Sequence, residues 1–352
     1  MISDILKEES SWEVLSTSQK PVVLYGTGNG ADMVLDEFHR LGIQVAGIVA
    51  SDGFVRKRSF RGFTVQSISQ IENELGDFIV ALGFATCIPQ VMESIRELSL
   101  RHHVLVPVVP VFGDEIFNRQ YLEEHLSTLE ESRSLLCDEE SKRVFDNMIR
   151  FQFTGELSYL FSIESQREAA LRDILCLTDK EDMLDLGAYR GDTIKEVISL
   201  FGGISSAIAL EPDKKTFEKL CTFAKNFPCV TPLPYAVWSE IKELSFSGGG
   251  GRQSALNSEG KDNVRAVSAD SITERKRITY VKMDVEGVEK EALLGMSKLL
   301  NDQKPKLSIA AYHRTCDLAE LIPLIHRLNP QYRIHLRHHP YIPCWDTNLY
   351  CV

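Results

Sequence analysis

Short apolar runs alternate with longer stretches of helical period along the chain, and they fall into two series. The first series has apolar runs at 22–25, 44–50, 77–82 and 104–109, each followed by a stretch of helical period. Strands that alternate with helices favour a parallel sheet covered by helices on both faces. We therefore expect residues 1–112 to form a first α/β domain.

A second series follows a helical connector. Residues 113–178 are rich in charge and of helical period, which predicts helices packed on a domain rather than a loose tether. Residues 179–352 are expected to form a second α/β domain around a seven-stranded sheet. Its strands are predicted at 183–186, 207–210, 230–237, 280–283 and 307–311, with helices between the first four, and at 332–336 and 349–352.

Composition and charge exclude several classes of protein. Hydrophobic residues make up 43% of the chain, and no run approaches the ~20 apolar residues that cross a bilayer. The acidic start of the chain is not typical of a secretory signal, so we expect a cytoplasmic protein. A net charge of −11 repels phosphate backbones and argues against a nucleic-acid partner. Eight cysteines without a C-x-x-C pair indicate reduced thiols, and we predict no metal site.

The strongest local motif is a glycine turn between a buried strand and a helix. Glycines there let the backbone approach a ligand at the carboxyl end of the strand. Glu211 ends the next strand, where its carboxylate can accept hydrogen bonds from both hydroxyls of a ribose. The alternative is that Asp185 and Glu211 only cap turns and helices. The predicted cofactor residues here are Asp185, Gly187, Ala188, Tyr189, Gly191, Asp192, Thr193, Glu211 and Pro212.

Two further predicted strand ends have residues that can contact a cofactor or an acceptor. Ala236 and Val237 are predicted to place a backbone amide and an apolar wall against an adenine ring. Asp284 and Glu286 share one face at the end of their strand, so both carboxylates point into the crevice. Such a pair can orient a hydroxyl, accept its proton or hold a divalent cation. Alternatively, Glu286 and Glu289 only complement the positive end of the following helix.

These motifs together resemble the FkbM family of methyltransferases. The resemblance rests on the segments 185–193, 210–213 and 281–287 and covers residues 179–352. It implies a class I methyltransferase fold, Rossmann-like, and S-adenosylmethionine as cofactor. It also implies that Asp185 and Gly187 contact the amino acid moiety of the cofactor, Glu211 its ribose, and Asp284 the region of the transferred methyl. Characterised members methylate hydroxyls of sugars or polyketide rings, so a sugar, a glycan precursor or another small metabolite is the expected acceptor.

Methyl transfer to an alcohol needs the oxygen held in line with the methyl group and relieved of its proton. Asp284 is the first candidate for this role, and Glu286 stands beside it. His313 follows the strand at 307–311 and is a second candidate base, because an ordinary imidazole is largely neutral at pH 7. A histidine at a strand end is also commonly a structural residue.

The first domain carries a weaker nucleotide motif. Its layout resembles the small Rossmann-like domain ahead of sugar O-acyltransferases, which receives a nucleotide-linked sugar. Three interpretations stay open for it: a nucleotide-sugar site, a dinucleotide site, or a structural module without a ligand. The candidate residues are Gly26, Gly28, Asn29, Gly30 and Asp52.

The preferred function is O-methyl transfer, with the first domain helping to bind the acceptor. Two other classes remain open at this point. One is an NAD-dependent oxidoreductase that works through Gly26 and Gly28, and the other is a noncatalytic protein that only senses a cofactor or partner. The sequence also leaves open whether the chain forms an oligomer.

Overall fold

The computed structural model describes residues 2–51, 59–247, 255–256 and 262–352. It confirms the predicted class, a mixed α/β protein with parallel sheets. The chain forms two compact units. The first contains Met1–Glu130, Lys142–Glu164 and His338–Asp346, and the second contains Glu131–Ser141, Ser165–Arg337 and Thr347–Val352. The helical connector expected at 113–178 is thus divided between the units.

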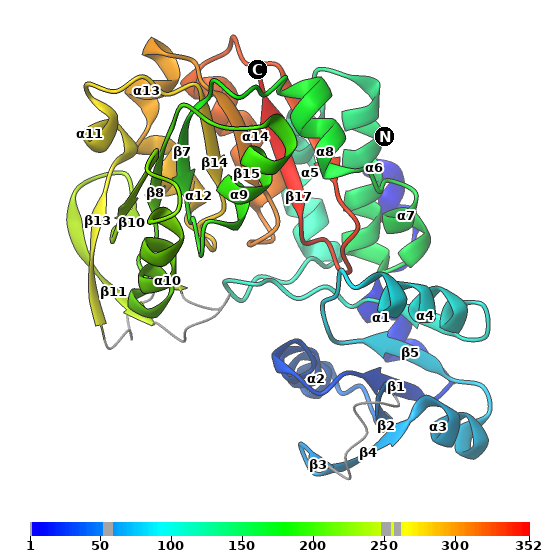
Figure 1. The fold of residues 1–352 in the computed structure, drawn as a ribbon. Coiled ribbons are helices and arrows are strands. Elements are labelled where there is room, and N and C mark those ends of the chain that lie inside the picture. Colours follow the sequence, from blue (N-terminus) through cyan, green and yellow to red (C-terminus); the bar gives the residue numbers. More distant parts are fainter. Residues whose placement is uncertain (1, 52–58, 248–254, 257–261) are drawn as a thin grey trace. The chain divides into compact units, whose positions relative to one another are not determined.

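The first unit is built on a six-stranded sheet of order β3-β4-β2-β1-β5-β6. All neighbouring strands are parallel except β3, which runs antiparallel to β4. Figure 1 shows α2 beside β1, and α3 packs on β2 and β4. The strands are β1 (Val22–Tyr25), β2 (Val45–Ala50), β3 (Ser59–Phe60), β4 (Phe63–Ser67), β5 (Ile79–Leu82) and β6 (His103–Leu105).

Two helices of this region begin with capping boxes. Ser10 and Ser67 each accept a hydrogen bond from the backbone three residues on and form capping boxes at the starts of α1 and α3. The elements are a 3₁₀ helix (Ile2–Lys7), α1 (Ser11–Thr17), α2 (Asn29–Leu41), α3 (Ile68–Leu75), α4 (Pro89–Ser99), α5 (Arg119–Ser134), α6 (Glu139–Thr154) and α7 (Leu157–Phe161).

The second unit is built on a seven-stranded sheet of order β16-β17-β15-β14-β7-β8-β9. The strands from β15 to β9 run parallel, and β17 is antiparallel to β15. Strand order reverses at β7, which is the topological switch point where α/β sheets bind ligands. The strands are β7 (Asp182–Leu186), β8 (Ser206–Leu210), β9 (Val230–Leu233), β14 (Tyr280–Met283), β15 (Lys306–Ala310), β16 (Ile334–His338) and β17 (Thr347–Cys351).

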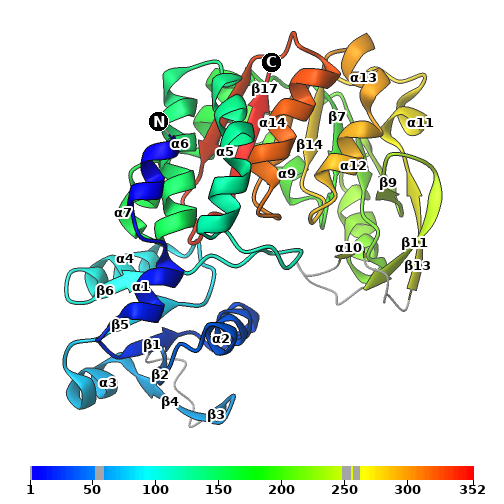
Figure 2. The ribbon, with the colours of Figure 1, turned by 180° about the vertical axis from the view of Figure 1, so that it is seen from behind.

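Helices cover both faces of this sheet. Figures 1 and 2 show α9 and α14 on opposite faces. Buried apolar side chains of β7, β8 and α9 form one core cluster with Tyr280 and Tyr350. The helices are α8 (Arg167–Ala169), a π-helix (Ala170–Ile174), α9 (Asp192–Phe201), α10 (Lys214–Ala224), α11 (Ala269–Thr273), α12 (Glu289–Leu294), α13 (Ser297–Asp302) and α14 (Asp317–Leu328).

The region 230–267 differs from the prediction. The expected strand at 230–237 is two strands, and Pro234, which lies between them, lacks the N–H group that a continuous ladder needs. A helix, α11, does precede β14 as expected, but the described residues between β9 and α11 also include a four-stranded sheet of order β10-β13-β11-β12 that was not predicted. Its strands are β10 (Ala236–Val237), β11 (Lys242–Ser247), β12 (Ala255–Leu256) and β13 (Asp262–Val267). Among all described residues, no helix has the length and apolarity that crossing a membrane requires.

Candidate functional site

The glycine turn after β7 lies against the end of β14. Gly187 has a left-handed φ of +80°, and a Cβ placed on it would lie 1.9 Å from the carbonyl oxygen of Asp284. Only glycine fits there. The backbone N–H groups of Gly187 and Ala188 both donate to the carbonyl of Leu210 at the end of β8. The ends of β7, β8 and β14 are therefore tied together at one edge of the sheet.

Asp185 is fully buried near the end of β7. Neither of its carboxylate oxygens has a hydrogen-bond partner in the structure. Its nearest cation is Lys282 on β14, whose Nζ lies 3.4 Å from Oδ1 and donates to the Gly187 carbonyl at 2.7 Å. Burial raises the pKa of Asp185, and Lys282 offsets part of this rise. A buried carboxylate without hydrogen-bond donors is the state expected of a ligand-binding group.

Glu211 lies just beyond β8 and is 8% exposed. Its carboxylate accepts a hydrogen bond from the backbone N–H of Asp213 at 2.8 Å and another from the backbone of Tyr189 in the glycine turn. Burial raises its pKa to about 7. Asp213, not Glu211, caps α10 by accepting from the N–H of Thr216. Glu211 therefore does not cap α10, although it accepts from two backbone N–H groups of the neighbouring turns.

Asp284 and Glu286 follow β14, and the structure brings both to one imidazole. The Nε2 atom of His313 lies 3.3 Å from Asp284 Oδ1 and 3.4 Å from Glu286 Oε2. Burial and the neighbouring carboxylate of Asp284 raise the pKa of Glu286 to about 7, although His313 lowers it. Burial also raises the pKa of Asp284, but Lys282 and His313 outweigh it, so this pKa lies below its usual value.

The charge state of His313 differs from the expected neutral imidazole. Its side chain is 2% exposed, and Nδ1 lies 2.8 Å from Oε1 of the buried Glu289. Burial lowers the pKa of His313, but the charge and hydrogen bond of Glu289, together with Asp284 and Glu286, raise it to about 10. Without a ligand the imidazole is therefore protonated at neutral pH and cannot act as a base in that state. The sequence could not reveal this, because Glu289 and His313 are far apart along the chain.

Two residues of this site were not among the predicted ones. Lys282 is 6% exposed and contacts the glycine turn, and the hydroxyl of Tyr312 donates to Asp284 Oδ1 at 3.2 Å. A lysine inside an otherwise apolar strand could have indicated a residue of the site, since a buried ammonium needs carboxylate or carbonyl partners. The carboxylates of Asp185 and Asp284 outweigh burial and raise the pKa of Lys282.

Of the other predicted cofactor residues, some lie on the glycine turn after β7 or beside it, and two lie on β10. Gly191 has a φ of +84°, and a Cβ there would lie 2.4 Å from the ring of Phe223. Ala236 and Val237 are buried but belong to β10, which pairs with β13 in the four-stranded sheet. They do not end a strand of the main sheet, contrary to the prediction. The remaining turn residues are Tyr189, with a φ of 48°, Asp192 and Thr193 at the start of α9, and Pro212 between Glu211 and Asp213.

Among the described residues, two groups of side chains have the composition and spacing of metal ligands, although the sequence predicted none. In the first, ligand atoms of Asp284, Glu289 and His313 lie within 4.8 Å of one another. In the second, the same limit holds for Cys137, Asp138 and His335. The first group shares Asp284 and His313 with the candidate catalytic residues but contains Glu289 in place of Glu286.

The glycine turn of the first unit has the expected local geometry. Gly26 has a φ of +138°, and a Cβ on Gly30 would lie 2.9 Å from the Gly83 carbonyl, so the turn packs closely on the chain after β5. A Cβ on Gly28 would meet nothing within 4 Å. Asn29 is the first residue of α2. Asp52 lies outside the described residues, and the nucleotide site itself stays a prediction.

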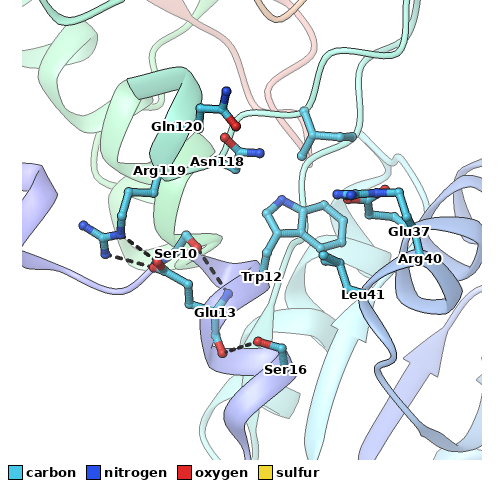
Figure 3. Close-up of a pocket in the computed structure, with 11 residues that line it drawn as sticks. Ser10, Trp12, Glu13, Ser16, Glu37, Arg40, Leu41, Asn118, Arg119 and Gln120 are labelled. Carbon is cyan, nitrogen blue, oxygen red and sulfur yellow. Dashed lines mark hydrogen bonds and ion pairs between the residues drawn. The ribbon is translucent and has the colours of Figure 1, made fainter. Parts of the chain in front are cut away.

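A cavity of about 260 Å³ lies elsewhere in this unit, near the carboxyl end of α2. Figure 3 shows the indole of Trp12 at its centre, with Leu41 beside it and polar groups of α2 and α5 around it. The glycine-turn residues do not line it. Its lining residues are Ser10, Trp12, Glu13, Ser16, Glu37, Arg40, Leu41, Ile116, Asn118, Arg119 and Gln120.

Comparison with known proteins agrees with this geometry. Hexuronic acid methyltransferase AglP from Haloferax volcanii is 28% identical over 180 residues, which cover 47% of this chain and 74% of the relative. A crystal structure of a methyltransferase FkbM from Methylobacillus flagellatus KT has the same fold, with a TM-score of 0.72 at 20% identity. The match covers 100% of this chain and 93% of that one. The model of the methyltransferase FkbM domain matches residues 185–333, so this segment of the chain is similar to that family.

Proposed function

We propose that the protein transfers a methyl group from S-adenosylmethionine to a hydroxyl of a sugar or glycan precursor. The observation that carries this proposal is the contact between Gly187 and Asp284 at the switch point of the sheet. It puts the predicted cofactor turn and the predicted acceptor residue side by side. A cofactor held on the turn therefore has its reactive end next to a carboxylate.

The residues at this edge fit the cofactor. Asp185 offers two buried carboxylate oxygens that lack hydrogen-bond partners, as an ammonium ligand requires. Glu211 offers a largely buried carboxylate at the end of the neighbouring strand, suited to paired ribose hydroxyls. Gly187 has no side chain because the Asp284 carbonyl fills that place, and this keeps the turn against the end of β14. When bound, S-adenosylmethionine supplies a methyl group on a positively charged sulfur.

Asp284 is the proposed proton acceptor. Its side chain is 38% exposed, so an acceptor hydroxyl can reach it, and Tyr312 fixes Oδ1 by a hydrogen bond. The hydroxyl oxygen forms a bond to the methyl carbon as the bond between that carbon and sulfur breaks. The proton of the hydroxyl passes to the Asp284 carboxylate. Geometry contributes most to such a reaction, because the sulfonium is already a good leaving group.

A sugar acceptor is supported by the similarity to a hexuronic acid methyltransferase. The alternation of carboxylates with His313 and Tyr312 also suits a ring that carries several hydroxyls, each of which needs a hydrogen-bond partner. The proposed part of the first unit is to hold a nucleotide-linked acceptor at Gly26–Gly30.

The test combines ligand binding with turnover. The full chain is incubated with S-adenosylmethionine and a panel of nucleotide-linked hexoses and hexuronic acids, and products are identified by mass. Glu211→Ala should lose affinity for S-adenosylhomocysteine, whereas Asp284→Ala should keep that affinity and lose turnover. Glu320→Gln, on the exposed Glu320–Lys290 pair, is the matched control and should change neither. Wild-type protein that does not bind S-adenosylhomocysteine would refute the proposal.

A further inference from the structure

Three side chains of the second unit meet where the loop between α5 and α6 lies along β16. Cys137 and Asp138 belong to this loop, and His335 belongs to β16. The backbone N–H of Cys137 donates to the carbonyl of Ile334 at 3.0 Å and ties the loop to the strand. β16 is an edge strand of the seven-stranded sheet and is separated from β7 by β17, β15 and β14. The group therefore lies outside the proposed cofactor site.

The three side chains have the order of a nucleophile, a base and an orienting group. Sγ of Cys137 lies 3.2 Å from Nε2 of His335. On the other side of the ring, Nδ1 lies 2.6 Å from Oδ2 of Asp138. A thiol within hydrogen-bond reach of an imidazole, which a third group orients in turn, is the usual arrangement of an activated nucleophile.

The contacts of Asp138 determine which ring nitrogen carries the proton. Its Oδ1 accepts from the backbone N–H of Ser141 at 2.6 Å, and its Oδ2 accepts from Arg337 at 3.1 Å. Burial raises the pKa of Asp138, but these contacts and His335 outweigh it and hold the pKa below its usual range. An ionised carboxylate only accepts hydrogen bonds, so Nδ1 is the donor toward it. Nε2 of the neutral ring is then the acceptor and faces the thiol of Cys137.

The protonation states of the pair suit proton transfer from sulfur to nitrogen. Burial, helped by Arg337 and Arg333, lowers the pKa of His335 more than Asp138 raises it, so the imidazole is neutral at pH 7 and can act as a base. Burial and the charge of Asp138 raise the pKa of Cys137, although Arg333 opposes them. The thiol is therefore protonated at rest, and its proton passes to Nε2 as the sulfur attacks.

The surroundings of the thiol indicate which reagent it favours. Cys137 is exposed, so a molecule in solution can reach it. Arg333 is also exposed and lies close enough to hydrogen-bond the thiol. Its guanidinium can attract a carboxylate on an incoming reagent. The neighbouring thiol of Cys351 on β17 is buried, and burial raises its pKa, so it stays protonated.

We propose that Cys137 is a nucleophilic thiol that exchanges with low-molecular-weight disulfides carrying carboxylates, with His335 as its base and Asp138 as the positioning residue. Sγ forms a bond to one sulfur of the disulfide while the bond between the two sulfurs breaks. The proton of the thiol passes to Nε2 of His335 and then to the departing thiolate, which leaves as a thiol. One disulfide is consumed and one is formed. The inference does not depend on the proposed methyl transfer.

The first test uses the wild-type full chain with reduced cysteines and a chelator present. Oxidised glutathione is the disulfide, and mass spectrometry of peptides follows its addition to each cysteine. Cys87 and Cys176 are the matched controls, because both are exposed and Sγ of Cys176 contacts a backbone carbonyl instead of an imidazole. At pH 7 Cys137 should react ~10-fold or more faster than either control. Equal rates would overturn the inference.

The pH dependence of the same reaction gives a second test without variants. An ordinary thiol reacts through its thiolate, so its rate falls steadily from pH 8 to pH 6. The rate at Cys137 should change much less over this range, because the neutral imidazole of His335 takes the proton during the reaction. A fall at Cys137 that parallels the fall at the two control cysteines would contradict the role of His335.

Variants separate the base from the positioning residue. His335→Gln should slow the reaction at Cys137 ~10-fold or more and leave the control cysteines unchanged. His326→Gln, on α14, is the matched control and should react like the wild type. Asp138→Asn keeps an acceptor for the Ser141 N–H but loses the charge that stabilises a protonated imidazole. It should slow the reaction several-fold, and the remaining rate should fall with pH as at the control cysteines. Circular dichroism checks that each variant is folded.

The preference for an anionic disulfide is tested at Arg333. Arg333→Gln should slow the reaction of Cys137 with oxidised glutathione several-fold and leave its reaction with the neutral hydroxyethyl disulfide unchanged. An equal effect on both disulfides would overturn the preference for carboxylates. A wild-type rate at Cys137 in His335→Gln would overturn the proposed thiol and base pair as a whole.

Discussion

Gly187 is the residue on which the geometry of the proposed site depends most directly. Its positive φ and the 1.9 Å approach of a Cβ to the Asp284 carbonyl are two separate constraints. The positive φ would strain the backbone of any other residue at this position. The close approach would push the ends of β7 and β14 apart. A comparison of glycines can separate them.

Gly187→Ala should destabilise the protein and abolish cofactor binding, because β7 and β14 must move apart. Gly202 ends α9 with a similar φ of +86°, but a Cβ there would meet nothing within 4 Å. Gly202→Ala should therefore cost only the strain of a left-handed alanine, about 1–2 kcal/mol of unfolding free energy, and keep cofactor binding. Urea unfolding and titration with S-adenosylhomocysteine check both. Equal effects of the two changes would contradict the role given to the contact.

Glu211 links stability to cofactor affinity through its pKa of about 7. The folded state binds a proton more tightly than the unfolded state, whose carboxyl has the ordinary value of 4.5. Ionisation in the folded protein is therefore unfavourable, and stability falls as pH rises from about 4.5 to about 7. The ionised carboxylate is nevertheless the better acceptor for two ribose hydroxyls.

Glu211→Gln should raise the melting temperature of the ligand-free protein above that of the wild type at pH 8, and the difference should shrink toward pH 5. Affinity of the wild type for S-adenosylhomocysteine should increase as pH rises through about 7. The glutamine variant should bind more weakly and lose this dependence. Thermal melts and calorimetric titrations at both pH values provide the check. A variant that melts no higher than the wild type at pH 8 would disprove the argument.

The residues of the site differ in how far the sequence could reveal them. Asp185, Glu211 and Asp284 each end or follow a recognisable strand, so their common edge follows from parallel topology alone. The pairing of Glu289 with His313 depends on how the end of β14 meets the end of β15, which no local pattern encodes. The charge of His313 depends on that pairing, and it was therefore predicted wrongly.

At the scale of elements, strands with continuous apolar runs were the most predictable. β1 and β14 have the bounds that their sequences suggest, because buried parallel strands need apolar side chains on both faces. β11 and β13 were not predicted. Their segments, Lys-Glu-Leu-Ser-Phe-Ser and Asp-Asn-Val-Arg-Ala-Val, carry too few apolar residues to stand out, and they pair only with one another and with β10 and β12.

The start of α10 gives a test at this scale. Asp213 accepts from the N–H and the hydroxyl of Thr216, and its own N–H donates to Glu211. Asp213→Ala should lower the unfolding free energy by about 1 kcal/mol through loss of the N-cap and weaken cofactor binding by loosening Glu211. Asp213→Asn keeps a good cap and should retain most of both properties. Chemical denaturation and cofactor titration distinguish the variants, and an asparagine variant as impaired as the alanine one would count against capping.

At the scale of the whole molecule, the chain contains two units that each carry a glycine turn after a first buried strand. In the second unit the turn is accompanied by buried carboxylates at neighbouring strand ends, and that combination supports a cofactor site. In the first unit Asp52, the corresponding acidic residue, is outside the described residues. Binding of a ligand at that turn therefore has to be tested by substituting its glycines.

Gly28 allows such a test, because a side chain there has no neighbour within 4 Å and its effect on folding should be small. If the turn holds a nucleotide-linked acceptor, Gly28→Val should raise the KM for that acceptor several-fold while the affinity for S-adenosylhomocysteine and the melting temperature stay unchanged. A side chain at this position obstructs only a ligand whose phosphates approach the start of α2. Steady-state kinetics with the nucleotide-linked sugar and with the free sugar give the matched comparison. An equal KM for the variant and the wild type on both substrates would contradict a part for this turn in acceptor binding.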